Sequence, residues 1–530
     1  MKLIDKSPQA SYTTVLAMLK NILTFLLGPF HTAQGVYWPL LALFIAINGI
    51  VLFNSLAHDP KVGYDSRDYI AYIDVLSEGR LPEREETKQF FSPPLPFVAS
   101  AALQAFWQEN LPRAWRTPPG DAWAPNFLFY NFTYTIGQFP LGVAAKLTQL
   151  LNGAYSLILT FYLLKLVDLI KPENNHLKLA SLGFLGILPV YYKTFAYVRA
   201  EPLLGALAVL AAYLCIKIFI LKERQWHNVI LLGVMMGIAI LTRQWAFLLF
   251  PGIGMFALLL TAKRHINWRF LFTSLGAMTI IAFLVGGWYY LQLIDRFGTA
   301  LAFNRDPAEE LAIDNQSLEF YFGLGLDEIF TDPIRRSFSG QIIPVIYSEV
   351  WGDYWAYFTV FGRETDSLLF VDGPWINDLP QDPANYDPAD YTWRTNRYDI
   401  AAYLGRVNLL ALLPTGFFLA GVAISLKSIW AVWRQDQPNT TSQAYALFAF
   451  IILCTAGGFL WFLVRYTHQT PSTIKASYML QMLPVMAILA GEALMRFKAR
   501  WPKAFPVTLI LLALVILHNL PTLFTRYNTW

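Results

Sequence analysis

Long apolar runs constrain the fold of this chain more than any other feature of the sequence. A helix that crosses a bilayer needs about 20 predominantly apolar residues, and eleven runs are candidates for this role. The two runs on either side of Thr242-Arg243-Gln244 could form either a hairpin or one broken helix. The sequence therefore predicts an all-α polytopic membrane protein with about 11 transmembrane helices, near residues 37–57, 147–169, 178–195, 202–221, 229–242, 244–262, 270–293, 403–427, 444–464, 476–495 and 505–523.

The composition agrees with a membrane protein. Only 14% of the residues are charged and 55% are hydrophobic, whereas soluble domains carry roughly 25% charged residues. The net charge of +4 is too small to indicate a nucleic-acid partner, so none is expected. Cys215 and Cys454 both lie in apolar runs, where we expect core residues rather than a disulfide or a metal pair.

The distribution of Lys and Arg predicts the orientation, because short cytoplasmic loops carry an excess of basic residues. Basic residues mark the N-terminus and five short loops, and these alternate correctly with the predicted spans. The long polar regions 58–146 and 295–402 then lie on the opposite, extracytoplasmic face. We expect the second of these loops to cover a cavity as a lid.

Four parts of the chain follow from this topology. Residues 1–36 form a cytoplasmic or interfacial N-terminus, in which Thr14–Phe30 is predicted as an amphipathic helix on the membrane surface. The other parts are a transmembrane core with the first outer loop (37–294), a large extracytoplasmic loop (295–402) and C-terminal transmembrane helices (403–530).

The first acidic residues of interest follow the first predicted span directly, in Tyr64-Asp65-Ser66-Arg67-Asp68-Tyr69. If Asp65 begins a short helix, Asp68 and Tyr72 lie on its face, at i+3 and i+7. Two carboxylates and a phenol would then point the same way at the membrane surface. That is a suitable place for acid–base chemistry on a substrate whose tail lies in lipid.

Arg199 and Glu201 lie between two predicted spans, and Pro202 fits the first turn of the next helix. Ionisable groups at membrane depth are costly, so each is a candidate for function. Glu201 would sit at a helix N-terminus, where the dipole favours an anion. One interpretation is a helix cap beside a headgroup-binding arginine, and the other is a second carboxylate of a site that contains Asp65.

Arg243 interrupts apolar sequence near the outer side, and Lys475 and Tyr478 open a later span on that side. Arg243 could be a snorkelling interfacial residue or a phosphate ligand, since a guanidinium suits phosphate oxygens. Basic residues on the outer face run against the cytoplasmic bias, and an anionic lipid phosphate would explain them. The run Ser348–Trp355 alternates aromatic and acidic residues, which is typical both of sugar-binding sites and of interfacial belts.

Several familiar motifs are absent from the sequence. It has no phosphate-cradling P-loop, zinc pattern, Gly-x-Ser-x-Gly motif or dinucleotide fingerprint. These absences argue against nucleotide-driven transport and against a nucleotide-sugar enzyme of the soluble Rossmann kind.

The arrangement resembles the GT-C superfamily of integral-membrane glycosyltransferases that use polyprenyl-phosphate sugars. The nearest branches are the protein O-mannosyltransferases, the aminoarabinose transferases and the glycosyltransferase family 39 proteins. Asp65 and Tyr69 match the Asp and Tyr of the family pattern Asp-Glu-x-x-Tyr, but Ser66 stands in place of the second acid. Further matches are Gly79-Arg80-Leu81-Pro82, Pro93-Pro94-Leu95, Arg199-Ala200-Glu201-Pro202, Leu241-Thr242-Arg243 and, more weakly, Lys475-Ala476-Ser477-Tyr478.

From the resemblance and the residues together we expect a glycosyltransferase that acts at the extracytoplasmic face. A polyprenyl-phosphate sugar is the donor, a hydroxyl of a glycolipid, polysaccharide or protein is the acceptor, and the resemblance implies inversion at the anomeric carbon. Asp65 is the expected general base, with Asp68 and Glu201 as further catalytic residues. Tyr69, Arg199, Arg243, Lys475 and Tyr478 are the expected substrate-binding residues.

Some alternatives stay open. The sequence identifies no cofactor with certainty, and Glu201 is expected to position either Arg199 or a divalent metal ion, if one is used. The chain could instead be a transporter or flippase for a lipid-linked sugar, or a non-catalytic scaffold of envelope glycan synthesis. The expected location is a bacterial cytoplasmic membrane, or the endoplasmic reticulum membrane if the chain is eukaryotic.

Overall fold

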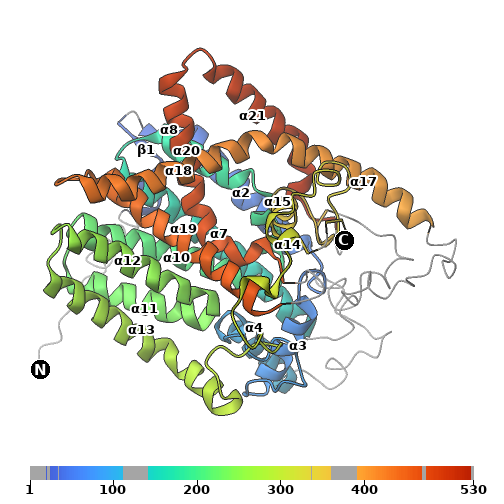
Figure 1. Cartoon of the computed structure of the whole chain (residues 1–530). Helices are drawn as coiled ribbons and strands as arrows, with labels where there is room; N and C mark the ends of the chain where they lie inside the picture. Colours follow the sequence, from blue (N-terminus) through green and yellow to red (C-terminus); the bar gives the residue numbers. More distant parts are fainter. Residues whose placement is uncertain are drawn as a thin grey trace, which may run out of the picture.

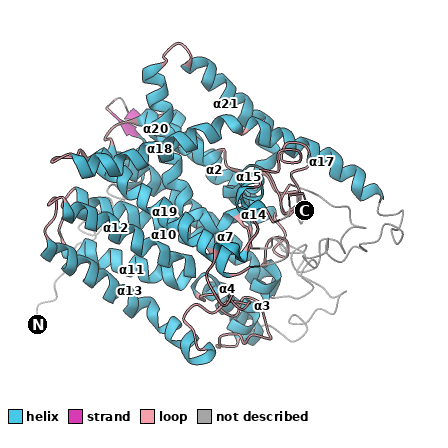
Figure 2. Ribbon diagram, viewed as in Figure 1, coloured by secondary structure: helices cyan, strands magenta, loops and turns pink. Residues whose placement is uncertain are grey.

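The computed structural model describes residues 20, 24–33, 35–110, 141–335, 337–338, 340–359, 391–467 and 473–526, with only the backbone of 32, 141–143 and 391–399. Most of the predicted helix Thr14–Phe30 lies outside this part of the chain. The described residues form a helical bundle (Figure 1). Their one sheet is the short hairpin of β1 (His31–Thr32) and β2 (Gly35–Val36), in which His31 pairs with Val36 (Figure 2).

Nine helical segments of the described chain are long and apolar enough to cross a bilayer. The bent pair α8 (Asn175–Gly186) and α9 (Pro189–Ala196), which meet at 63°, is apolar enough to form either a broken tenth span or a re-entrant loop. The nine are α2 (Trp38–Ala57), α7 (Leu141–Ile170), α10 (Glu201–Cys215) continued by the π-helical η2 (Ile216–Ile220), η3 (Gln244–Leu248) with α12 (Leu249–Ala262), α13 (Trp268–Phe297), α18 (Leu412–Arg434), α19 (Thr440–Arg465), η8 (Ala476–Met482) with α20 (Leu483–Arg500), and α21 (Phe505–Asn519) with η9 (Leu520–Leu523).

All eleven predicted apolar runs overlap these elements or the shorter helix α11 (Trp226–Thr242). The all-α, multi-pass integral-membrane class is therefore confirmed. The ambiguous pair of runs is a hairpin. Arg243 interrupts the helix with extended backbone angles of −159° and 143°, and the charges of Lys222 and Lys263, at the far ends of the two segments, both act on His265.

Burial divides the spans into an inner and an outer layer. The most apolar windows of the η8–α20 segment and of the α10–η2 segment are 89% and 78% buried, while those of α13, α18 and α21 are 33% buried. The inner helices therefore carry the core, and the outer ones face lipid. Small residues allow close crossings: a Cβ on Gly286 of α13 would lie 2.5 Å from the Gly237 carbonyl oxygen of α11.

Four shorter helices lie toward one end of the bundle (Figure 1). In the first polar loop, α3 (Ser66–Ser77) packs on α4 (Leu95–Asn110), and both pack on α7. In the second, α14 (Leu318–Phe322) packs on α15 (Ile342–Trp351), and α15 packs on α9, η8 and α17 (Tyr391–Leu410). These loop helices cover the spans at the end where the candidate site lies.

A buried ion pair fixes α15 to α9. Lys193 Nζ lies 2.9 Å from Glu349 Oε1, and the two side chains are 1% and 0% exposed. The Asp353 carboxylate accepts hydrogen bonds from the backbone N–H groups of Phe358 and Thr359 at 2.8 and 2.7 Å. The acids of the Ser348–Trp355 run therefore hold the loop in place and do not face an open sugar site.

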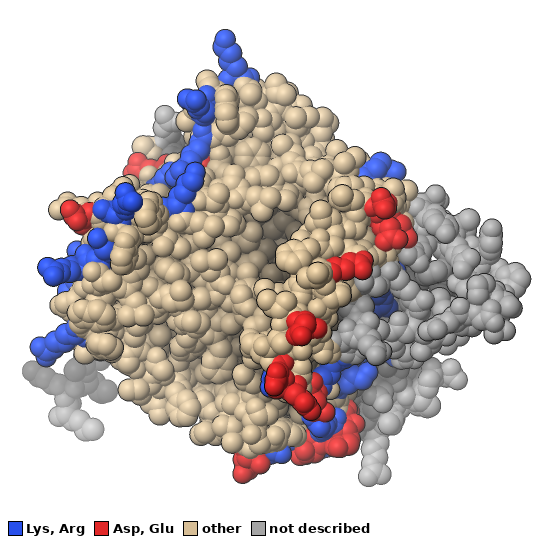
Figure 3. All heavy atoms as spheres, viewed as in Figure 1, with Lys and Arg blue, Asp and Glu red and all other residues tan. Residues whose placement is uncertain are grey.

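The surface charges separate along the bundle axis. Most charged side chains along the upper left edge of the view in Figure 3 are Lys and Arg, whereas Asp and Glu, with some Lys and Arg among them, lie along the right and lower right; a belt of uncharged side chains separates the two groups. This separation is what the sequence pattern predicts for a basic cytoplasmic end and an opposite outer end.

Candidate active site

Asp65 is the N-cap of α3 and has a left-handed backbone conformation, with φ of 55° and ψ of 13°. Such a conformation is uncommon for residues other than glycine, and non-glycine residues held there concentrate at functional sites. An N-cap aspartate normally accepts a hydrogen bond from its own helix, but the Asp65 carboxylate does not. It pairs instead with Lys475, with Oδ2 and Nζ 2.8 Å apart, and the side chains are 24% and 9% exposed.

Glu201 joins two buried guanidinium groups. Arg199 Nε and Nη2 each donate to one of its carboxylate oxygens at 2.8 Å. Arg243 Nε lies 3.2 Å from Glu201 Oε1. Glu201 is the first residue of α10, as the sequence predicts, so the helix N-terminus adds a favourable field.

Arg243 connects this cluster to the first polar loop. Its Nη1 donates to the Tyr69 hydroxyl at 2.6 Å and to Ser92 Oγ at 3.0 Å. The carbonyl oxygen of Ser92 accepts hydrogen bonds from the hydroxyls of Tyr72 and Tyr289, both at 2.8 Å. The segment around Ser92 is thus fixed from three directions, and it fixes the guanidinium in turn.

Tyr478 lies among the cations of the site. The Arg199 and Arg243 guanidinium carbons and Lys475 Nζ lie 5.5, 5.6 and 5.8 Å from the centroid of its ring. Each distance is within the range of a cation–π interaction. Trp245 packs against the same ring, with the centroids 5.2 Å apart. Tyr478 therefore helps to hold three positive charges close together.

The electrostatics keep Asp65 ionised. Burial alone would raise its pKa, but the charges of Lys475, Arg199 and Arg243 and the hydrogen bond from Lys475 outweigh burial and lower the pKa below the ordinary aspartate value. Asp68 behaves in the opposite way, because burial and the nearby charge of Asp65 raise its pKa. The two carboxylates thus differ in proton affinity, which suits different roles.

The structure brings together all eight residues that the sequence selected. Asp65, Tyr69, Arg199, Glu201, Arg243, Lys475 and Tyr478 are linked by direct contacts, and the charges of Asp65 and Lys475 both act on Asp68. The prediction that the Tyr72 phenol points at the membrane surface was wrong. Its side chain is fully buried beside Phe97 and bonds to a backbone carbonyl, so it supports the site and does not face the membrane surface.

Other residues of the site were missed or given no role. Ser92, which directly precedes the Pro93-Pro94-Leu95 match, was given no role, yet its hydroxyl accepts a hydrogen bond from Arg243. Tyr64 packs edge-on against Tyr357 of the second loop, at 5.6 Å between centroids, and Lys475 Nζ lies 5.4 Å from its ring. Arg305 lies within electrostatic reach of Asp65, and nothing in the sequence singled it out.

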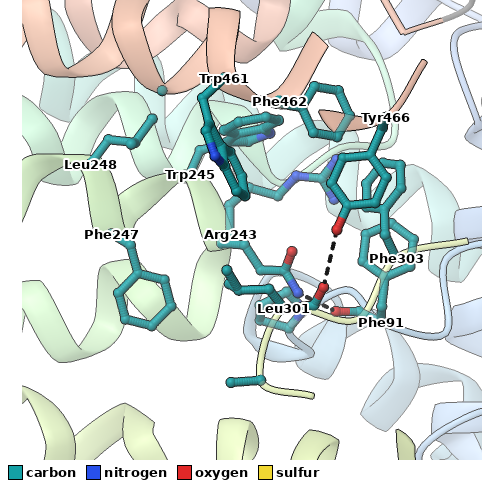
Figure 4. A pocket seen from close by; sticks show the side chains of 14 residues that line it. Phe91, Arg243, Trp245, Phe247, Leu248, Leu301, Phe303, Trp461, Phe462 and Tyr466 are labelled. Atoms are coloured by element: carbon teal, nitrogen blue, oxygen red, sulfur yellow. Dashed lines mark hydrogen bonds between the residues drawn. The ribbon is translucent and has the colours of Figure 1, made fainter. Parts of the chain in front are cut away.

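An apolar pocket of about 360 Å³ opens beside Arg243. Figure 4 shows Phe247, Leu248 and Trp461 along this pocket, with Arg243 also among the side chains that line it. Apart from Arg243 and Gln244, the lining is almost wholly apolar or aromatic. The pocket therefore suits an apolar chain with an anionic group at the arginine.

No three His, Cys, Asp or Glu side chains of the described residues are grouped in a way that could hold a metal ion. Both carboxylate oxygens of Glu201 already bind guanidinium groups. This arrangement suits a residue that orients the two arginines better than it suits a metal ligand.

Comparison with known proteins bears on the class of protein. Residues 127–332 match the model of Glycosyltransferase family 87. The match bears out the resemblance to integral-membrane glycosyltransferases, although the family number is 87 where the motifs suggested 39. It covers less than half of the chain, and it includes Arg199, Glu201 and Arg243 but neither Asp65 nor Lys475.

The chain is also similar to a solved structure of ArnT from Cupriavidus metallidurans bound to undecaprenyl phosphate. The identity is 13%, the TM-score is 0.34, and the alignment covers 86% of this chain and 78% of that one. No curated protein sequence matches the chain. Because the identity and the TM-score are this low, the function has to be argued from the chain's own residues.

Proposed function

We propose that this membrane glycosyltransferase moves a sugar from a polyprenyl-phosphate donor to an acceptor hydroxyl, with inversion, at the extracytoplasmic face of a bacterial cytoplasmic membrane. The observation that carries the proposal is the meeting of one partly buried carboxylate and three cations beside an apolar pocket that one of these cations, Arg243, helps to line. Asp65 is the base, and Arg199, Arg243 and Lys475 receive the phosphate.

The charge balance of the cluster supports an anionic ligand. Arg199, Arg243 and Lys475 carry three positive charges against the two negative charges of Asp65 and Glu201. Arg199 Nη1 is buried and has no hydrogen-bond partner among the described residues. A buried donor without a partner is costly, and a phosphate oxygen would satisfy it with a charge-assisted hydrogen bond.

The pocket beside Arg243 supports a lipid tail on that ligand. A polyprenyl chain is apolar along its whole length, so its favourable environment is a lining such as that of Phe247, Leu248 and Trp461. Because Arg243 belongs both to the pocket and to the charged cluster, it marks where the tail ends and the phosphate begins.

The chemical step then follows from the positions of the charges. The acceptor hydroxyl attacks the anomeric carbon, and its proton passes to the Asp65 carboxylate. The bond between the anomeric carbon and the phosphate oxygen breaks, and its electron pair leaves with the phosphate, where the cations stabilise the growing charge. General-base catalysis of this kind contributes typically about 10²–10⁴-fold.

The direct test is replacement of Asp65 by Asn in purified protein supplied with a labelled polyprenyl-phosphate sugar. Asp74→Asn is the matched control, because Asp74 is on the same helix and its hydrogen bond from Gln104 can persist with Asn. We expect Asp65→Asn to lower the transfer rate by about 10² or more and Asp74→Asn to preserve it. A wild-type rate in Asp65→Asn removes this residue from the mechanism.

The same assay tests the role of metal. We propose that the cations of the site neutralise the phosphate, so a chelator should leave the transfer rate unchanged. Loss of transfer on chelation, restored by a divalent ion, would instead place a metal ion in the site.

A further inference from the structure

A second groove lies between α18 and α20, apart from the site described above. Its volume is about 530 Å³, and its lining combines apolar residues of both helices with Lys427, Arg496 and Arg500. Lys427 belongs to α18, which ends at Arg434, and Arg496 and Arg500 belong to α20, which ends at Arg500. The basic residues of the sequence predict that these helix ends lie on the cytoplasmic side. The groove therefore has an apolar floor and a cationic end.

Small residues on α18 create the apolar floor. Gly416, Ala420 and Ala423 are spaced at i, i+4 and i+7, so they share one helix face. A Cβ on Gly416 would meet no atom within 4 Å, so the space above it is open. From Leu413 to Lys427 the helix rises about 21 Å, and half of the hydrocarbon core is about 15 Å thick. One acyl chain of a single leaflet fits this length.

The cations at the end of the groove exceed the anions that they meet. Glu492, which is buried, accepts from Arg496 Nε at 2.9 Å and from Lys171 Nζ at 2.6 Å. Within the part of the chain that the structure describes, Lys427 and Arg500 have no side-chain hydrogen bond or ion pair. Arg496 therefore shares Glu492 with Lys171, while Lys427 and Arg500 have no such partner, so the lining of the groove carries a surplus of positive charge.

We propose that this groove binds an anionic glycerophospholipid from the leaflet at the basic end of the protein. The phosphate lies among Lys427, Arg496 and Arg500, and one acyl chain lies along Gly416 and Ala420. Trp501, which also lines the groove, sits where an aromatic ring suits the headgroup region.

A helix from a second copy of the chain is the competing occupant, because small residues four apart also suit close helix packing. A symmetric dimer uses the same patch on both subunits. It would therefore bring the three cations of one copy against the three of the other, which is unfavourable without an intervening anion. The charge of the groove favours the lipid.

Native mass spectrometry of the purified full chain, titrated with phosphatidylglycerol or phosphatidylcholine, tests the proposal. The variant Lys427→Gln/Arg496→Gln/Arg500→Gln should weaken binding of phosphatidylglycerol by about tenfold or more. The charge-matched control is Lys222→Gln/Arg264→Gln/Arg269→Gln, in which three exposed cations outside the groove are lost and binding should persist. Gly416→Leu fills the groove without a change of charge and should weaken binding as well.

Three results would overturn the proposal. Equal loss of phosphatidylglycerol in both triple variants means that surface charge alone attracts the lipid. Equal binding of phosphatidylcholine by the wild type means that the cations do not select the ligand. A Gly416→Leu variant that dissociates a dimer and binds phosphatidylglycerol normally assigns the groove to a second copy. If the triple variant does not fold, Gly416→Leu decides the question alone.

Discussion

Replacement of Glu201 by Gln removes the one negative charge that two buried guanidinium groups share. The side chains of Arg199, Glu201 and Arg243 are 0%, 1% and 4% exposed, so water cannot compensate the loss. Gln has almost the shape of Glu and keeps one acceptor oxygen. The substitution therefore changes the charge of the cluster and changes its packing little.

The expected loss of stability follows from this geometry. Breaking a buried ion pair by removing one partner costs about 3–5 kcal/mol. Because Gln keeps one acceptor, the lower value of about 3 kcal/mol is appropriate. At about 2 °C per kcal/mol for a large domain, the melting temperature should fall by about 6 °C.

Thermal unfolding can be followed with a thiol-reactive dye, since Cys215 is fully buried and becomes accessible only on unfolding. A Cys454→Ala background removes the other, partly exposed thiol. The control is Glu78→Gln, which breaks an exposed ion pair with Arg80 and should leave the melting temperature near the wild-type value. If Glu201→Gln melts within about 1 °C of the wild type, the buried cluster does not stabilise the fold as described.

Three further predictions concern the reaction. Lys475→Gln removes the main charge that lowers the pKa of Asp65, so this pKa should rise and the acidic limb of the rate–pH profile should move to higher pH. An acidic limb at the wild-type pH would mean that Lys475 does not control the ionisation of Asp65. Arg243→Lys keeps the positive charge but loses the forked guanidinium group that reaches both Glu201 and Tyr69. The KM for the donor, measured by steady-state kinetics, should therefore rise about tenfold. An unchanged KM would exclude Arg243 from donor binding. Leu301→Trp narrows the apolar pocket, so the KM should rise more for a long-chain donor than for a short-chain analogue; equal rises would place the tail elsewhere.

Much of the fold is predictable because each membrane span requires a long run of apolar residues. All eleven runs became helices. The break at Arg243 could not be classified from sequence, since a hairpin and a kinked helix have the same composition there. The bend between α8 and α9 depends on packing, and every residue of α9 is buried against other helices.

The site was predictable where a charge interrupts apolar sequence, as at Glu201 and Arg243. Ser92 and Tyr64 were not, because a serine and a tyrosine in an outer loop have no feature that separates them from solvated residues. The apolar pocket could not be predicted from the sequence either, because its lining residues are as apolar as the rest of the spans. Residues such as Trp461 look like ordinary lipid-facing or core residues until the neighbouring helices are in place.

The pairing of Asp65 with Lys475 spans 410 residues of chain. During synthesis the acid emerges with the first span, and its cation arrives only with one of the last. An incomplete polypeptide therefore holds a carboxylate that lacks its ion-pair partner, and premature termination upstream of Lys475 leaves the charged cluster unassembled in the membrane.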